Sequence, residues 1–229
     1  MSKFEILGTD MRKLDVSPKE AIKYWLATEQ IDCDFLKQII DAQTTLPEDI
    51  FPHIRIGWYM FANGKFSPFA DTYPQPVGVV AWMKPDLNPK AGERGLVILF
   101  DEFSGIWAES TLHFVGCDSP SDGAENTDKM VACLKSAKID FPIAEFCEQI
   151  RNLYNGVAFL PAYKQLDKIA ISNSVICKAF QDVGKKFHTI LQSSTEVDDN
   201  TVICLDMKNS NIIHSNKTSL KHAYLIMKF

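Results

Sequence analysis

The sequence lacks the patterns that identify several large classes of protein. No run approaches the ~20 consecutive apolar residues that a membrane-spanning helix needs, and no charged flank followed by an apolar run marks a signal peptide at the start. Basic residues are not clustered and the formal net charge is −5, so an electrostatic footprint for nucleic acid is missing. We therefore expect no membrane span, no nucleic-acid partner, and a cytoplasmic location unless the chain is exported or processed to reach a cell surface or phage particle.

Metal-site signatures are also missing. None of the six cysteines forms a Cys-x-x-Cys pair, so we expect small buried thiols in a reducing compartment. The histidines are scattered without His-x-x-x-His spacing, so we expect neither a metal ligand among them nor a cofactor. The acidic loop that starts at Asp118 departs from an EF-hand at Pro120 and Lys129, which leaves open only an irregular calcium loop. The five histidines are His53, His113, His188, His214 and His222.

The segment "SSTE" at 193–196 combines hydroxyls with a carboxylate but lacks the signature of a hydrolase. A nucleophilic serine needs a positioned base, and although His188 lies just upstream, no Gly-x-Ser-x-Gly elbow is present. We expect the hydroxyls of Ser193 and Ser194 to bond backbone groups where the chain enters a strand. An enzyme whose site is assembled from dispersed residues such as His188, Glu196 and Asp206 stays open as an alternative.

The composition, 46% hydrophobic and 11% aromatic, is enough for one sizeable core with a small appendage. A capping box at 17–20 starts a predicted helix pair over 17–45, which gives an N-terminal helical appendage at 1–53 and a main domain at 54–229. The appendage is expected to serve attachment or homo-oligomerisation. Inside the main domain, the spacing of apolar residues and the turn residues predict both helices and strands.

Strand signals surround the helices of the main domain. Asn63-Gly64 predicts a hairpin turn, and the apolar runs at 77–83 and 95–103 predict paired strands. Helices follow between Thr127, a predicted cap, and Gly184, a predicted helix end. Further strands are expected at 201–207, 212–214 and 222–229. The fold class is therefore α+β, and the segments 77–82 and 222–229 should share one sheet.

The polar tail at 198–222 is the candidate binding site. Strand alternation should point Ile203, Leu205 and Met207 into the core, so that Asp206 and Lys208 face outward beside Cys204. The alternative is a set of solvated hairpin turns. The residues expected to contact a ligand are Asp198, Asp199, Asn200, Asp206, Lys208, Asn209, Asn211, His214, Lys217 and Lys221.

Three segments carry a resemblance to a known family: "GVAFLPAYKQL" at 156–166, "SSTE" at 193–196 and the terminal Phe229. In this order the chain from residue 57 onward resembles a bacterial family of C-type-lectin-like domains. That family is related to the formylglycine-generating enzyme fold and to variable proteins diversified by retroelements. The resemblance implies a C-type-lectin-like domain that binds a protein or glycan through its polar C-terminal β meander.

The chain departs from that family at several positions. Gln192 stands where the family has Trp, and Ile203-Cys204 stands where it has an aromatic pair. Tyr224 and Met227 replace arginines of the last strand. The calcium-lectin motifs are missing, so calcium-dependent sugar binding is not implied, and neither is the oxidase chemistry of the formylglycine-generating relatives.

The leading functional hypothesis is a non-enzymatic, adhesin-like or receptor-like binding module. One alternative is a structural subunit of a phage or cell-surface assembly, and another is the enzyme with a dispersed site. A reverse transcriptase encoded beside the gene would favour a receptor diversified by a retroelement.

Overall fold

The computed structural model describes residues 4–7, 13–16, 54–85, 94–109, 114–137 and 140–229. The chain divides into two compact units, Met1–Ile54 and Arg55–Phe229. In the first unit, β1 (Phe4–Leu7) pairs antiparallel with β2 (Lys13–Val16), a hairpin that the sequence pattern did not predict. The helix pair predicted at 17–45 lies outside the described residues.

The second unit is built on one mixed sheet, which has eight strands among the described residues, in the order β4-β3-β5-β6-β10-β7-β8-β9. Neighbouring strands are antiparallel except β10 and β7, which are parallel. Because β5 and β10 both pair with β6, the prediction that 77–82 and 222–229 share a sheet is confirmed. The strands are β3 (Tyr59–Phe61), β4 (Phe66–Ser67), β5 (Pro76–Met83), β6 (Gly95–Gly105), β7 (Ile190–Glu196), β8 (Thr201–Asp206), β9 (Asn211–Asn216) and β10 (Lys221–Lys228).

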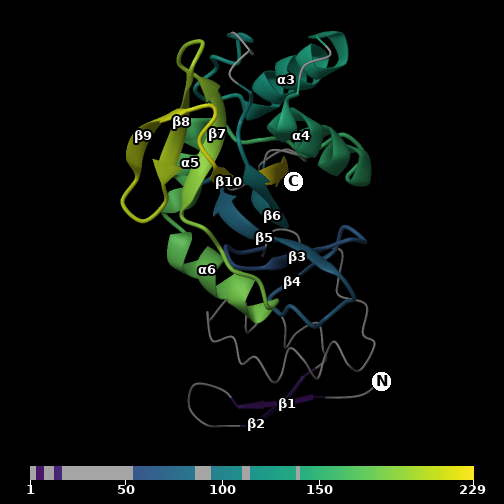
Figure 1. Ribbon diagram of the computed structural model, residues 1–229. Helices are drawn as coiled ribbons and strands as arrows, with labels where there is room; N and C mark the ends of the chain where they lie inside the picture. The colour runs from purple at the N-terminus through teal and green to yellow at the C-terminus, as the bar shows by residue number, and fades with distance from the viewer. Residues whose placement is uncertain (1–3, 8–12, 17–53, 86–93, 110–113, 138–139) are drawn as a thin grey trace. The chain divides into compact units, whose positions relative to one another are not determined.

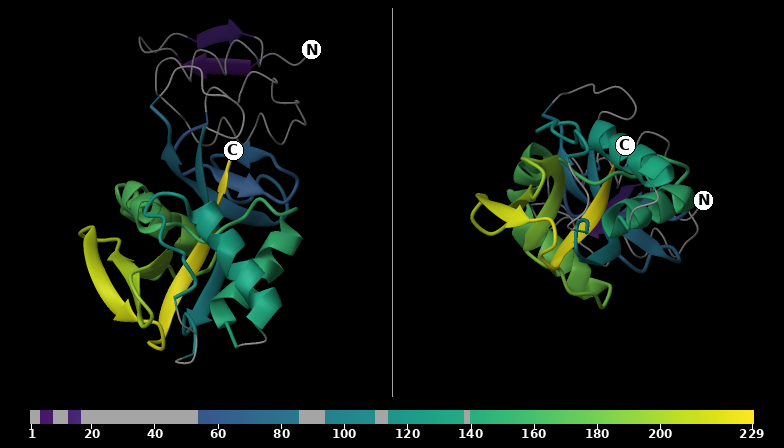
Figure 2. Two further views of the ribbon diagram at one scale, coloured as in Figure 1. Left: turned by 90° about the horizontal axis from the view of Figure 1, so that it is seen from above. Right: turned by 45° about the horizontal axis from the view of Figure 1, so that its top comes forward.

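Helices cover both faces of this sheet (Figures 1 and 2). Successive side chains of a strand leave opposite faces, and β6 shows the two layers: Phe100 packs against Phe180 of α6, whereas Phe103 packs against Phe146 of α4. Since each face is packed, residues 95–100 of β6 are all buried. The helices are α3 (Gly123–Ala137), α4 (Pro142–Leu153), α5 (Tyr163–Ala170) and α6 (Asn173–Asp182).

One local prediction, the turn after β3, is confirmed, and another, the cap of α3, is wrong. Gly64 has a φ of 76° and its amide donates to the Phe61 carbonyl, so the Asn63-Gly64 turn joins β3 to β4 as predicted. Thr127 does not cap a helix: Asp122 does, because its Oδ1 accepts the amides at 124 and 125 at the start of α3. The Thr127 hydroxyl instead donates to the carbonyl of residue 123 inside that helix.

The predicted C-type-lectin-like α+β domain is wrong. The described residues of the second unit form one eight-stranded mixed sheet with helices on both faces, and the terminal strand β10 lies in the middle of that sheet. The segments that carried the resemblance make hydrogen bonds to neighbouring elements of the fold, such as the one from the Leu160 amide to the Thr127 hydroxyl of α3. Hydrogen bonds of this kind form wherever a helix packs next to a sheet, whatever the order of the strands. Sequence segments that supply them therefore do not identify one fold.

Candidate functional site

The segment 217–220, here called the strap, crosses one face of the sheet. β9 lies at the edge while β10 lies beyond β8 and β7, so the connection has to pass over those two strands (Figure 1). Gln192 Nε2 on β7 donates to the Ser219 carbonyl at 3.3 Å, and the Trp107 amide donates to the Lys217 carbonyl at 2.8 Å. The strap is therefore fixed to β7 and to the segment that follows β6.

The strap closes the face that was expected to bind a ligand. Gln192 pairs with Cys204, so these two side chains leave the sheet on the strap side, and Cys204 is fully buried. Leu205 and Met207 are buried in the core on the other face, as predicted, whereas Ile203 is only partly buried. The expectation of an open recognition face beside Cys204 is wrong, because β8 has buried side chains on both faces.

A buried ion pair holds the strap in place. Lys217 Nζ lies 2.6 Å from Glu196 Oε1, and the two side chains are 2% and 0% exposed. The Glu196 carboxylate also accepts the amides of Val115 and Cys117, the latter at 2.8 Å. The Lys217 ammonium lies 5.0 Å from the centroid of the Trp107 ring. Lys217 was expected to face outward and contact a ligand. That prediction is wrong, because its side chain is buried.

The serines of the SSTE segment have structural partners. Ser193 Oγ donates to the Ile203 carbonyl at 2.7 Å and accepts the Thr195 amide, which confirms its expected backbone bond. Ser194 Oγ accepts from Asn126 Nδ2 at 3.1 Å, so the backbone partner expected for it is wrong. Neither hydroxyl bonds a histidine in the part of the chain that the structure describes. The segment lies within β7 and is buried throughout.

Most of the other predicted contact residues lie in turns at the two ends of the β8–β9 hairpin, here called the outer hairpin (197–216). In the first turn, Asp198 Oδ1 accepts the Asn200 amide at 2.8 Å. In the second, Asp206 Oδ1 accepts the Lys208 amide at 3.0 Å. These are side-chain-to-backbone bonds typical of Asx turns. The Asn200 amide is also the main reason why the pKa of the Asp198 carboxyl is lowered.

The structure does not bring the predicted contact residues into one patch. The two turns lie at opposite ends of β8, and its six residues separate them by about 20 Å. His214 is exposed between them on β9. Lys221 is partly exposed at the start of β10. One end of the hairpin carries Asp198, Asp199 and Asn200, and the other carries Asp206, Lys208, Asn209 and Asn211.

The sheet edge at β9 is a feature that the sequence analysis missed. The Lys217 amide donates to the Asn200 carbonyl, and this bond shows which residue pairs of β8 and β9 are hydrogen-bonded to each other. Because backbone groups alternate in direction along a strand, the amides and carbonyls of Ile212 and His214 point away from β8. The Ile212 side chain is 50% exposed. β9 is the last strand of the sheet in the described residues, so it presents a backbone edge beside an exposed apolar side chain.

The dispersed enzyme site is not assembled. His188 lies two residues before β7, whereas Glu196 is its last residue, so β7 separates them by about 20 Å. Glu196 is also buried against Lys217. The structure does bring His188 close to His222, with ring centroids 3.5 Å apart. No local sequence pattern indicated this, because the two histidines meet through the pairing of β7 with β10.

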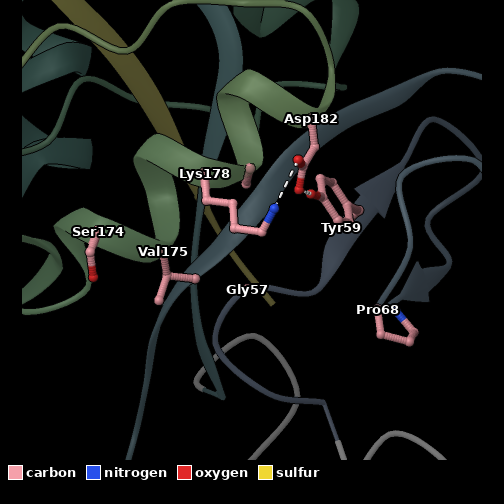
Figure 3. Close-up of a pocket in the computed structure, with 8 residues that line it drawn as sticks. Gly57, Tyr59, Pro68, Ser174, Val175, Lys178 and Asp182 are labelled. Carbon is pink, nitrogen blue, oxygen red and sulfur yellow. Dashed lines mark hydrogen bonds and ion pairs between the residues drawn. The ribbon is translucent and has the colours of Figure 1, made fainter. Parts of the chain in front are cut away.

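A hollow of about 440 Å³ lies beside α6 (Figure 3). Tyr59 Oη donates to Asp182 Oδ2 at 2.9 Å, and Lys178 Nζ lies 3.1 Å from Asp182 Oδ1. Burial, followed by this bond, raises the pKa of Tyr59. Since both oxygens of Asp182 have partners, we assign no chemistry to the hollow. It is lined by Gly57, Tyr59, Pro68, Ser174, Val175, Lys178, Ala179 and Asp182.

Comparisons with known proteins identify a related fold. No family model matches the chain, and no curated protein matches it. Among solved structures, the chain is similar to a fimbrial protein from Bacteroides ovatus ATCC 8483, with a TM-score of 0.62 and 14% sequence identity. The match covers 77% of this chain and 49% of the fimbrial protein. At this identity the likeness shows the fold alone, and that fold replaces the predicted C-type-lectin-like one. None of the helices in the described residues combines the length and apolarity that crossing a bilayer requires.

Proposed function

We propose that the chain is a binding subunit of a cell-surface assembly and that it contacts a protein partner through the outer hairpin. The observation that carries this proposal is the edge of β9, where the backbone groups of Ile212 and His214 point away from β8. An edge of this kind can pair with an extended segment of another chain. The fold shared with a fimbrial protein agrees with a role in surface assembly.

The residues around the edge suit a protein ligand. Main-chain hydrogen bonds along β9 would supply affinity, and the exposed Ile212 side chain would supply apolar contact. The turn at the start of β9 adds polar groups at the rim, among them the exposed Lys208 and Asn209. A partner of this type would add a further strand beyond β9.

The sheet beneath the edge is well fixed. The strap and the Glu196–Lys217 pair hold β7 against the segment after β6, and β8 is buried between β7 and β9. A rigid base limits the conformational entropy that is lost on binding. The outer hairpin therefore presents its turns and edge in a preorganised arrangement.

Site-specific photo-crosslinking tests this proposal. A benzoylphenylalanine at position 214 should yield one protein adduct when the chain is produced in its native cells. The matched control carries the same residue at position 178, on α6, where the Lys178 side chain is 75% exposed. An adduct from position 178 with none from position 214 would place the partner on another surface and contradict the proposal.

A further inference from the structure

Three side chains with metal-binding atoms meet on the face of the sheet that α5 and α6 cover. β10 pairs with β6 so that His222 lies opposite Ser104, and Tyr224 lies opposite Glu102. Glu102 and His222 are thus diagonal neighbours on one face. His222 also pairs with Leu191 of β7, which brings in His188 from the segment before that strand. The cluster joins three parts of the chain that are distant in sequence.

The distances within the cluster are short. His222 Nδ1 lies 2.7 Å from Glu102 Oε1, and His188 Nε2 lies 3.4 Å from the same oxygen. The imidazole rings are stacked, with an interplanar angle of 13°. The ligand atoms of all three residues lie within 4.8 Å of one another. Ligands of a tetrahedral zinc ion are separated by about 3.3 Å, given bonds of about 2.0–2.1 Å.

We propose that Glu102, His188 and His222 form a site for a divalent transition-metal ion, with zinc as the best fit. Two imidazole nitrogens and one carboxylate oxygen are a donor set that zinc accepts, and they leave a fourth position for water or for a group from another molecule. A metal ion bound to Nδ1 of His222 and to Oε1 of Glu102 would replace the direct contact of 2.7 Å between these two atoms.

The side chains of the cluster can be reached from solvent. Those of His188 and His222 are 25% and 27% exposed, and that of Glu102 is 33% exposed. A metal ion can therefore approach the three ligand atoms without a rearrangement of the sheet.

The segment that carries His188 is held in position by Tyr224. The His188 amide donates to Tyr224 Oη at 3.2 Å, and Tyr224 Oη donates to the Lys186 carbonyl at 3.3 Å. Tyr224 itself is buried between Phe180 and Phe187. Supporting contacts of this kind orient the ligands of metal sites. Because β6, β10 and the segment before β7 all contribute to the site, a bound ion should also stabilise the fold.

Titration of the metal-depleted full chain with ZnCl₂ tests the proposal. Calorimetry should show one ion bound per chain, and saturating Zn²⁺ should raise the Tm by about 3 °C or more. Co²⁺ used as a spectroscopic substitute should give visible absorption bands. His188→Ala and His222→Ala should each weaken Zn²⁺ binding at least about tenfold, as should Glu102→Gln.

The matched control is His214→Ala, which removes an exposed histidine of β9 and should leave Zn²⁺ binding unchanged. Circular dichroism of the metal-free variants establishes that they are folded, and His188→Gln replaces any His188→Ala protein that is not. The proposal is overturned if Zn²⁺ does not bind, if the His188 and His222 variants bind as tightly as the unmodified chain, or if His214→Ala abolishes binding.

Discussion

The buried strap and the exposed turn of the outer hairpin contain the same kinds of residue but differ in their surroundings. Under the strap, Glu196 and Lys217 are almost completely buried and bond each other. In the turn of the outer hairpin, Asp206 and Lys208 remain at least partly exposed. The difference arises from the order of the strands, because the connection to β10 has to pass over β7 and β8. Polar composition in this tail therefore does not by itself mark a binding surface.

The largest effect should come from breaking the buried pair. Lys217→Met keeps most of the side-chain volume but leaves the Glu196 carboxylate buried without its ammonium partner. We expect the free energy of unfolding to fall by about 3 kcal/mol or more, measured by denaturant titration. Lys208→Met removes the same charge from the exposed turn and should change it by about 0.5 kcal/mol at most. If the two changes lowered the free energy of unfolding by similar amounts, the buried strap and the exposed turn would not differ as described.

An intermediate effect is expected at Ser194. Its hydroxyl accepts a hydrogen bond from Asn126 and is fully buried, so Ser194→Ala should lower the free energy of unfolding by about 1 kcal/mol. The exposed Ser174 of α6 provides the control, because Ser174→Ala removes a hydroxyl from a solvent-facing position. Thermal and urea unfolding would check both. A Ser194→Ala protein as stable as the unmodified chain would show that this bond contributes nothing.

The smallest effect on stability should come from the exposed turn. Asp206→Ala combined with Lys208→Ala should shift the free energy of unfolding by about 0.5 kcal/mol or less, yet it should weaken binding of the protein captured by crosslinking at position 214. Lys135→Ala on α3 serves as a distant charge control, since that side chain is 64% exposed. Unchanged affinity of the double variant, measured by calorimetry, would exclude this turn from the interface.

Local structure could be predicted well from this sequence. The Asn63-Gly64 turn, the apolar runs that form β5 and β6, and the helix end before Gly184 all depend on neighbouring residues. Alternation also placed Leu205 and Met207 in the core. Such signals depend on a few neighbouring residues, and at these positions the structure agrees with them.

Long-range arrangement could not be predicted. The strap and the meeting of His188 with His222 depend on β10 inserting between β6 and β7, and no local pattern carries that information. Lys217 shows the consequence: within a polar loop sequence it was assigned to the surface, whereas the strand order places it against Glu196. The predicted C-type-lectin-like fold is wrong for the same reason, because short matching segments are compatible with more than one order of strands.

The central claim is that the β9 edge binds a partner through its backbone, and a comparison of two substitutions at one position tests it. His214→Pro removes the amide that points away from β8 without removing a β8–β9 ladder bond, whereas His214→Ala removes only the exposed side chain. The measurement is the Kd for the crosslinked partner, with circular dichroism to establish that both variants are folded. We predict at least about tenfold weaker binding for His214→Pro, which corresponds to about 1.4 kcal/mol, and about threefold or less for His214→Ala. Binding by His214→Pro as tight as that of the unmodified chain would contradict the account.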